Sequence, residues 1–262
     1  MFNIYRIFYI LLHITFSVIN VLKEAWAVLL VLIKNLKFQI FTKEIREDNF
    51  KTDVEYLLTF LTRFDKTRLP NHLVLILGRE SPSFYDIVRI IGWCATAGIP
   101  CISFYDHKGL LRKCENEARK ELARSKPELV DYVDWNSRCP VKTVKNGING
   151  TKHKMKVQLL SHTDGKREIA LLAKSLGKGV ITGALKVEEI VAELLENKLE
   201  LGGLPDPDLA IICGKTCSTY GLLPWHIRTT EFLLIDTHHN LKVTEFVHIL
   251  AKYGRCEQRY GK

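Results

Sequence analysis

The sequence predicts an α/β fold with a central, mostly parallel sheet and helices on both faces, preceded by an N-terminal membrane helix. Short apolar runs of strand length alternate with helical stretches, which is typical of βαβ units. The strand-like runs lack alternating polar residues, as strands do when a parallel sheet is covered on both faces. A long uncharged run precedes this alternation. The 262-residue chain, which is 47% hydrophobic, can bury a substantial core.

Residues 1–33 are predicted to form a membrane anchor. The run Ile7–Leu22 is 16 residues long and has no formal charge, and a second apolar run follows Lys23. One such run is slightly short for a span of about 20 residues, but it can cross if the Lys23 side chain snorkels. Four basic residues between 34 and 46 follow the anchor, and the positive-inside tendency then places the bulk of the chain in the cytosol.

Two alternatives to a spanning anchor stay open. The Ala-Trp-Ala at 25–27 resembles the cleavage site of a signal peptide, although the chain stays apolar after it. The segment could also be an amphipathic helix that lies in the membrane interface. In each case a charged, helix-prone linker over 34–69 joins the segment to the main domain over 70–262.

The first half of the domain contains two strand–helix pairs. "HLVLIL" (72–77) is a short apolar run of β type, and the helix over 83–97 that follows it closes at Gly98. "IPCISFY" (99–105) is the second strand, and the highly charged stretch 110–125 is the second helix.

The second half continues the alternation after an exposed polar excursion. "MKVQLLS" (155–161) is the third strand, and the helix "KREIALLAKSLG" after it carries apolar residues at i, i+3, i+4 and i+7: 169, 172, 173 and 176. A helix, two strands and a final helix complete the domain at 186–198, 209–213, 230–236 and 241–253. Ligands of such sheets bind at the carboxyl ends of the strands. The loops of interest therefore begin at Gly78, Tyr105, Ser161, Gly214 and Asp236.

Charge and cysteine content narrow the classes of partner. The net charge of +9 favours anionic partners, but no basic stripe is interleaved with stacking aromatics, so nucleic acid is disfavoured. The seven cysteines have no CxxC spacing, which argues against a zinc site and for reduced thiols. His238 and His239 follow a strand, and because neighbours on an extended chain point to opposite faces, a shared metal ion is not expected.

Five segments, in order, carry a family resemblance: "HLVLILGRE", "SFYDHKG", "LLSHTDGKREIALLA", "PDPDLAIICG" and "RYG". Over residues 70–262 the chain resembles the cis-prenyltransferases. It is most similar to their non-catalytic eukaryotic branch, the Nogo-B receptor type subunits of dehydrodolichyl diphosphate synthase, to which an N-terminal anchor also belongs. The resemblance implies the α/β sheet described above and residence at the endoplasmic reticulum membrane.

The chain departs from the catalytic pattern after the first strand. Catalytic members have an aspartate there, in a "HVAFIMDGNGRW" pattern, which holds Mg²⁺ against the allylic diphosphate. His72 matches the histidine of that pattern, and Gly78 falls where the aspartate should be. Glycine offers no side-chain oxygen, and Glu80, two residues away, is not expected to restore the geometry that Mg²⁺ requires.

A second departure lies after the strand at 209–213. Catalytic members continue with an "IRTSGExRLSNF" pattern whose arginines and serine bind a diphosphate. Here Ile212 replaces the first arginine and Cys217 lies near the second, and an aliphatic side chain cannot donate to phosphate. Lys215 and Ser218 remain open, either as donors or as a solvated lysine and a turn serine. The chain is therefore expected not to catalyse condensation by itself.

The resemblance assigns a role to the last residues. In this branch the C-terminal RxG crosses the dimer interface and completes the active site of a catalytic cis-prenyltransferase subunit. Arg259 would place its guanidinium against a diphosphate oxygen and Gly261 would donate its backbone N–H, whereas Tyr260 would pack. The implied substrates are isopentenyl diphosphate and an allylic diphosphate, with Mg²⁺ held by the partner.

The partner surface and a rival function complete the predictions. Trp225, Ile227 and Phe232 lie in the region that forms the family's dimer interface, although core packing explains them equally well. The rival function is a membrane-anchored receptor or scaffold that uses the same fold only to bind proteins. A scaffold has no need of the RxG residues.

Overall fold

The computed structural model describes residues 9, 11–23, 25–26, 29, 48–65, 68–135, 154–199 and 201–256. Arg259, Tyr260 and Gly261 lie outside these residues, as do the basic positions between 34 and 46. The chain forms two compact units, Met1–Thr52 and Asp53–Lys262.

The described part of the first unit is helical over residues 11–23. Within the stretches that the structure describes, no helix combines the length and the apolar composition needed to cross a membrane. The N-terminal anchor therefore stays a prediction.

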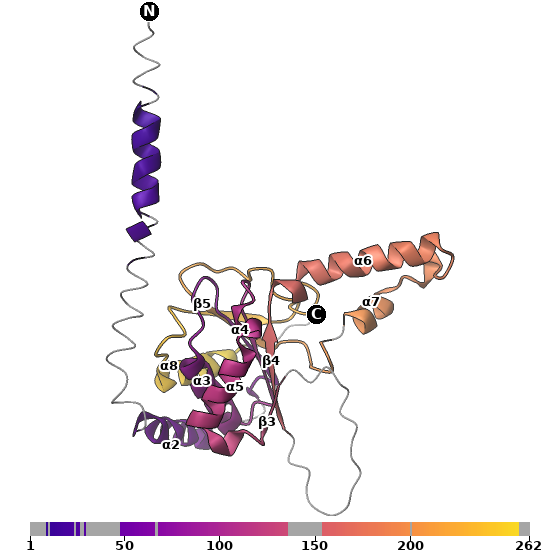
Figure 1. The fold of residues 1–262 in the computed structure, drawn as a ribbon. Helices are drawn as coiled ribbons and strands as arrows, with labels where there is room; N and C mark the ends of the chain where they lie inside the picture. The colour runs from indigo at the N-terminus through magenta and orange to yellow at the C-terminus, as the bar shows by residue number, and fades with distance from the viewer. Residues whose placement is uncertain are drawn as a thin grey trace, which may run out of the picture. The chain divides into compact units, whose positions relative to one another are not determined.

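The second unit is built on a sheet whose six described strands run in the order β3-β4-β2-β1-β5-β6 (Figure 1). Every pair of neighbouring strands is parallel. The strands are β1 (His72–Ile76), β2 (Cys101–Tyr105), β3 (Val133–Trp135), β4 (Met155–Leu160), β5 (Leu209–Cys213) and β6 (Glu231–Ile235). The predicted parallel sheet is thus confirmed, and all carboxyl ends lie at one edge.

The three central strands are the most deeply buried part of the sheet. Every residue of β1, β2 and β5 is buried, which requires cover on both faces. Ile76 pairs with Tyr105 on one side and with Ile212 on the other, so these three strands end level with one another. The level ends place the loops after β1, β2 and β5 next to each other.

The helices that cover the sheet are α3 (Phe84–Ala97), α4 (Leu110–Lys113), α5 (Glu115–Ser125) and α8 (Val243–Tyr253). Helix α3 begins after Ser83, whose side chain accepts the N–H of Asp86, and ends at Gly98 with φ of 81°, as its sequence predicts. The rings of Trp93 in α3 and Phe246 in α8 lie 5.4 Å apart, so these two helices share one apolar layer.

The C-terminal half of helix α2 (Asp48–Arg63) belongs to the second unit, which begins at Asp53. Leu57 and Leu61, four residues apart and therefore on one face, are 0% and 5% exposed. Asp53 forms an ion pair with Arg89 of α3 at 3.0 Å. This half of α2 is thus part of the domain's core, although it falls within the linker predicted over 34–69.

Three other elements differ from their predictions. Strand β3 was not predicted, because three residues are too few for a period-2 pattern. The helix over 110–125 is interrupted at Cys114. Helix α6 (Lys166–Ile181) forms as predicted, but neither it nor α7 (Ala192–Lys198) buries any residue, and Figure 1 shows both reaching beyond the sheet.

His72 makes the stability of the fold depend on pH. The side chain is 0% exposed, and its Nδ1 lies 2.7 Å from the carbonyl oxygen of Pro205, which can only accept, so Nδ1 carries the proton. Nε2 then accepts from the Ser103 hydroxyl at 2.7 Å. Burial is the largest cause that lowers the His72 pKa and so favours the neutral ring, in which both nitrogens keep these partners.

We expect the free energy of unfolding to fall as the pH drops below about 6.5, because the unfolded state then binds a proton that folded His72 does not. In the variant His72→Gln this decline should be shallower. Urea unfolding at pH 7.5 and 5.5 measures it, and the exposed His248→Gln variant is the control. An unchanged pH dependence in His72→Gln would contradict the assignment.

Candidate functional site

The strand order places the candidate site between β1 and β5. From β1 the chain moves outward to β2, and after β4 it returns to β5 on the other side of β1. Open α/β sheets bind ligands at such a reversal, outside the carboxyl ends of the strands. Gly78 follows β1 and Gly214 follows β5 at this point.

Gly78 has no room for a side chain. Its φ is +60°, a left-handed conformation that disfavours other residues, and it is buried. A Cβ atom at this position would lie 2.8 Å from the carbonyl oxygen of Cys213 and 3.2 Å from the Tyr220 ring. The first of these is a backbone atom of β5 that cannot turn aside. The structure therefore excludes an aspartate here unless the two strand ends move.

The loop after β5 packs against the carboxyl ends of β1 and β2. The Tyr105 hydroxyl donates to the carbonyl oxygen of Tyr220 at 2.7 Å, and burial, with nearby carboxylates, raises the Tyr105 pKa to about 12. Leu222 and Leu223 are 0% and 2% exposed and pack with core residues of β1 and β5. Sequence patterns did not reveal this, because two leucines in a loop carry no periodic signal.

The positions compared with the arginines of the catalytic pattern lie in β5 and in the loop after it. Ile212 is 0% exposed within the core, while Lys215 and Cys217 are exposed. The Ser218 hydroxyl accepts the N–H of Tyr220 at 3.2 Å, which makes it a turn residue. Of the two open readings for Ser218, the structure supports the turn.

Half-buried Glu80, two residues after Gly78, forms a hydrogen-bonded pair with buried His238. Glu80 Oε2 accepts from His238 Nδ1 at 2.5 Å, and the N–H of Ser83 donates to His238 Nε2 at 3.1 Å. Because Nε2 accepts, the neutral ring carries its proton on Nδ1. Burial raises the Glu80 pKa, but the hydrogen bonds that Glu80 accepts from His238 outweigh it and lower the pKa overall. The pair ties the loop after β1 to the loop after β6.

The pair belongs to a set of three possible metal ligands that does not fit Mg²⁺. Single ligand atoms of Glu80, Cys213 and His238 lie within 4.8 Å of one another. Mg²⁺ prefers several oxygen ligands, and this set offers one carboxylate whose oxygen is already hydrogen-bonded. Burial, together with Glu80, raises the pKa of the Cys213 thiol well above its ordinary value, so the thiol stays protonated.

Sequence reasoning missed this pair. Glu80 and His238 are 158 residues apart, and no local pattern links the two loops. The expectation that His238 and His239 point to opposite faces was wrong: their ring centroids are 4.1 Å apart, because the chain turns after β6 instead of continuing as a strand.

The three predicted interface residues are all half-buried. Ile227 and Phe232 pack against the core beneath β1 and β5, and the Arg228 guanidinium lies 5.5 Å from the Trp225 ring. The indole N–H of Trp225 is buried and finds no acceptor among the described residues. A role for these residues at an interface stays a prediction, as do the roles of Arg259, Tyr260 and Gly261 outside the described chain.

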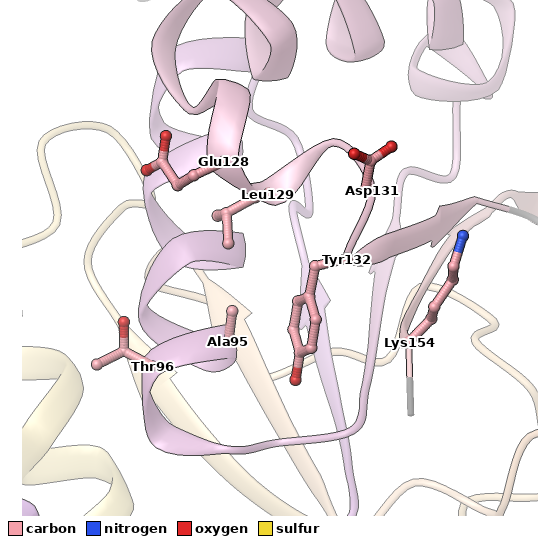
Figure 2. A pocket seen from close by; sticks show the side chains of 7 residues that line it. All are labelled: Ala95, Thr96, Glu128, Leu129, Asp131, Tyr132 and Lys154. Atoms are coloured by element: carbon pink, nitrogen blue, oxygen red, sulfur yellow. The ribbon is translucent and has the colours of Figure 1, made fainter. Parts of the chain in front are cut away.

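One cavity lies at the opposite edge of the sheet, near the amino ends of the strands. Its volume is about 450 Å³, and it sits between the end of α3 and the segments before β3 and β4. Figure 2 shows the lining side chains, which come from Ala95, Thr96, Glu128, Leu129, Asp131, Tyr132 and Lys154. None of the sequence-predicted site residues lines this cavity.

Comparison with known proteins gives named relatives. The chain is 33% identical over 199 residues to the human dehydrodolichyl diphosphate synthase complex subunit NUS1, which covers 74% of this chain and 68% of the relative. The mouse protein of the same name is 33% identical over 212 residues, covering 74% and 67%. The Saccharomyces cerevisiae protein is 27% identical, covering 68% and 53%. No model of a protein family matches the sequence.

Solved structures share the fold. Lavandulyl diphosphate synthase from Lavandula x intermedia superposes with a TM-score of 0.56 at 16% identity, covering 75% of this chain and 100% of its own. A probable undecaprenyl diphosphate synthase from Campylobacter jejuni gives 0.52 at 18% identity, covering 74% and 99%. With the parallel sheet and the human relative, these likenesses show that the chain belongs to the NUS1 family of dehydrodolichyl diphosphate synthase complex subunits and has the cis-prenyltransferase fold.

Proposed function

We propose that this chain is the non-catalytic subunit of a dehydrodolichyl diphosphate synthase complex and is inactive alone. The proposal rests mainly on the lack of room for a side chain at the carboxyl end of β1. Gly78 replaces the metal-binding aspartate, and the Cys213 carbonyl leaves no room for one. The strand ends are covered by the chain's own Tyr220 and Leu222 instead of a ligand.

Within the proposed complex, the chain completes the partner's active site through its last residues. Arg259 donates charge-assisted hydrogen bonds to a substrate diphosphate, and Gly261 brings a backbone N–H close to the same anion. The substrates are isopentenyl diphosphate and an allylic diphosphate, whose condensation lengthens a cis-polyprenyl chain that serves as a dolichol precursor. Mg²⁺ is held by the catalytic partner, because the donor set near Gly78 does not suit it.

The surface proposed for the partner includes helix α6. Its apolar residues Ile169, Leu172 and Leu176 follow helical spacing, yet no residue of α6 is buried. An amphipathic helix whose apolar face stays only half-covered by the described residues is typical of an interaction surface. The named relatives are subunits of a complex, which supports a catalytic subunit as the occupant. Trp225, Ile227 and Phe232 remain a second candidate region.

We place the complex at the endoplasmic reticulum membrane, with the main domain in the cytosol and residues 1–33 as its anchor. The basic positions between 34 and 46 suit anionic lipid headgroups. The alternative, a receptor or scaffold that binds proteins without a role in chemistry, predicts that the complex would not depend on Arg259.

Replacing Arg259 separates the two functions. In Arg259→Ala, prenyl transfer by the purified complex should fall about 10- to 100-fold, since a hydrogen bond to a charged group contributes about 1.5–3 kcal/mol. Affinity for the catalytic subunit should not change. The measurement is incorporation of isopentenyl diphosphate, with Arg255→Ala as a control of the same residue type. Unchanged activity in Arg259→Ala would favour the scaffold.

Restoring an aspartate at Gly78 should not create an enzyme. We expect Gly78→Asp to cost about 1–3 kcal/mol more unfolding free energy than Gly98→Asp, because of overpacking. Gly98 is the matched control: its φ is +81°, but a Cβ there would meet nothing within 4 Å. Thermal unfolding measures the difference. Mg²⁺-dependent prenyl transfer by the isolated Gly78→Asp chain would refute the packing argument.

Adjacent leucines of α6 provide a test of the partner surface. Leu172 lies on the apolar face, whereas Leu171, one residue earlier, is 57% exposed and turned by about 100° toward Arg167 and Lys178. Leu172→Glu should weaken binding to the catalytic subunit about tenfold or more, because a charge would be buried without a partner. Leu171→Glu should change binding less than about twofold. Equal effects of the two, measured by calorimetric titration, would exclude this face.

A further inference from the structure

We propose that Phe64 and Arg68, which follow α2, fix Gly254 at the end of α8, where the C-terminal tail begins. Both are then positioning residues for prenyl transfer by the complex. We call Phe64, Arg68 and Gly254 the tail clamp. The inference rests on the proposed function, in which Arg259 acts at the partner's site.

The first contact of the tail clamp is the packing of Phe64 on Gly254. Gly254 directly follows α8 and is buried, although Arg255 and Cys256 after it are exposed. A Cβ atom at Gly254 would lie 2.5 Å from Cζ of Phe64 and 3.4 Å from Cβ of Arg68. The absence of a side chain at Gly254 is what allows the aromatic ring to cover the end of α8.

The second contact is a hydrogen bond at the same point. Arg68 Nη1 donates to the carbonyl oxygen of Gly254 at 3.1 Å. The last carbonyls of a helix have no partners within the helix, and a cation is favoured there by the helix dipole. Arg68 also lies 3.7 Å from Asp65, an exposed ion pair that contributes little by itself.

Residues of α2 pack against the tail clamp and connect it to the core. The Phe64 and Phe60 rings stack with centroids 4.7 Å apart, and Leu57 and Leu61 fix the helix to the core. Phe64 and Arg68 are therefore held by the domain, and they hold Gly254 in turn. All of these contacts join residues of the second unit.

The position of Gly254 matters because few residues separate it from Arg259. Arg259 follows Gly254 by five residues, which span at most about 17 Å when extended. If the last turn of α8 frayed, about four more residues would become free. The local concentration of a tethered group falls roughly as the −3/2 power of the free length or more steeply, so Arg259 would reach its target about two- to threefold less often.

The test uses the complex of full-length chains and measures kcat/KM for isopentenyl diphosphate. Phe64→Ala combined with Arg68→Ala should lower it about threefold at unchanged affinity for the catalytic subunit. Arg68→Ala alone, at an exposed position where folding is not at risk, should give part of this loss, and Arg68→Lys, which can still donate to Gly254, should recover it. The exposed Arg63→Ala is the control.

A double-mutant cycle with Arg259→Ala distinguishes positioning from general damage. If the clamp acts through Arg259, its removal should cause little further loss in the Arg259→Ala background, where no tethered guanidinium is left to position. The same fractional loss in both backgrounds would mean that the contacts are only structural and would overturn the inference. No loss from the clamp variants, while Arg259→Ala is impaired, would also overturn it and leave the proposed function standing. If Arg259→Ala itself is fully active, the proposed function fails, and the clamp with it.

Discussion

The close approach of Gly78 to the Cys213 carbonyl is the constraint on which the carboxyl edge of the sheet depends. Two strand ends that lie this near leave no space for a side chain, and the left-handed φ at Gly78 reinforces the restriction. The loop after β5 can then fold down, so that Tyr220 covers Gly78 while Leu222 and Leu223 join the core. The absence of a side chain at Gly78 and the packing of this loop over the strand ends belong to one backbone arrangement.

The core of the domain rests on apolar burial in its central strands. The residues of β1, β2 and β5 are buried throughout, and burial of apolar surface is the main favourable contribution to folding. The order and register of the sheet therefore depend on this apolar packing. The surfaces proposed above lie at the periphery of the domain, on the apolar face of α6 and in the region where the segment after α2 meets the end of α8.

Sequence patterns predicted the regular elements well where a pattern was long enough to detect. The strand over 72–77 and the helix over 83–97 were found because apolar runs, a Ser cap and Gly98 punctuate them. Strand β3 was missed because three residues carry no period, and its only described partner is β4. The Glu80–His238 pair was missed because it joins loops 158 residues apart, and adjacency in space at that separation has no local signature.

The sequence alone determined the order of the strands along the chain, the absence of a carboxylate at Gly78 and the presence of an Arg-Tyr-Gly motif beyond α8, because these are properties of single positions and short runs. Only the tertiary structure decided that Gly78 could accept no side chain, that the amphipathic α6 buries nothing, and that Phe64 and Arg68 hold Gly254. The reason is physical: excluded volume and exposure depend on which distant residues meet, and the parallel sheet brings together loops that the chain keeps far apart.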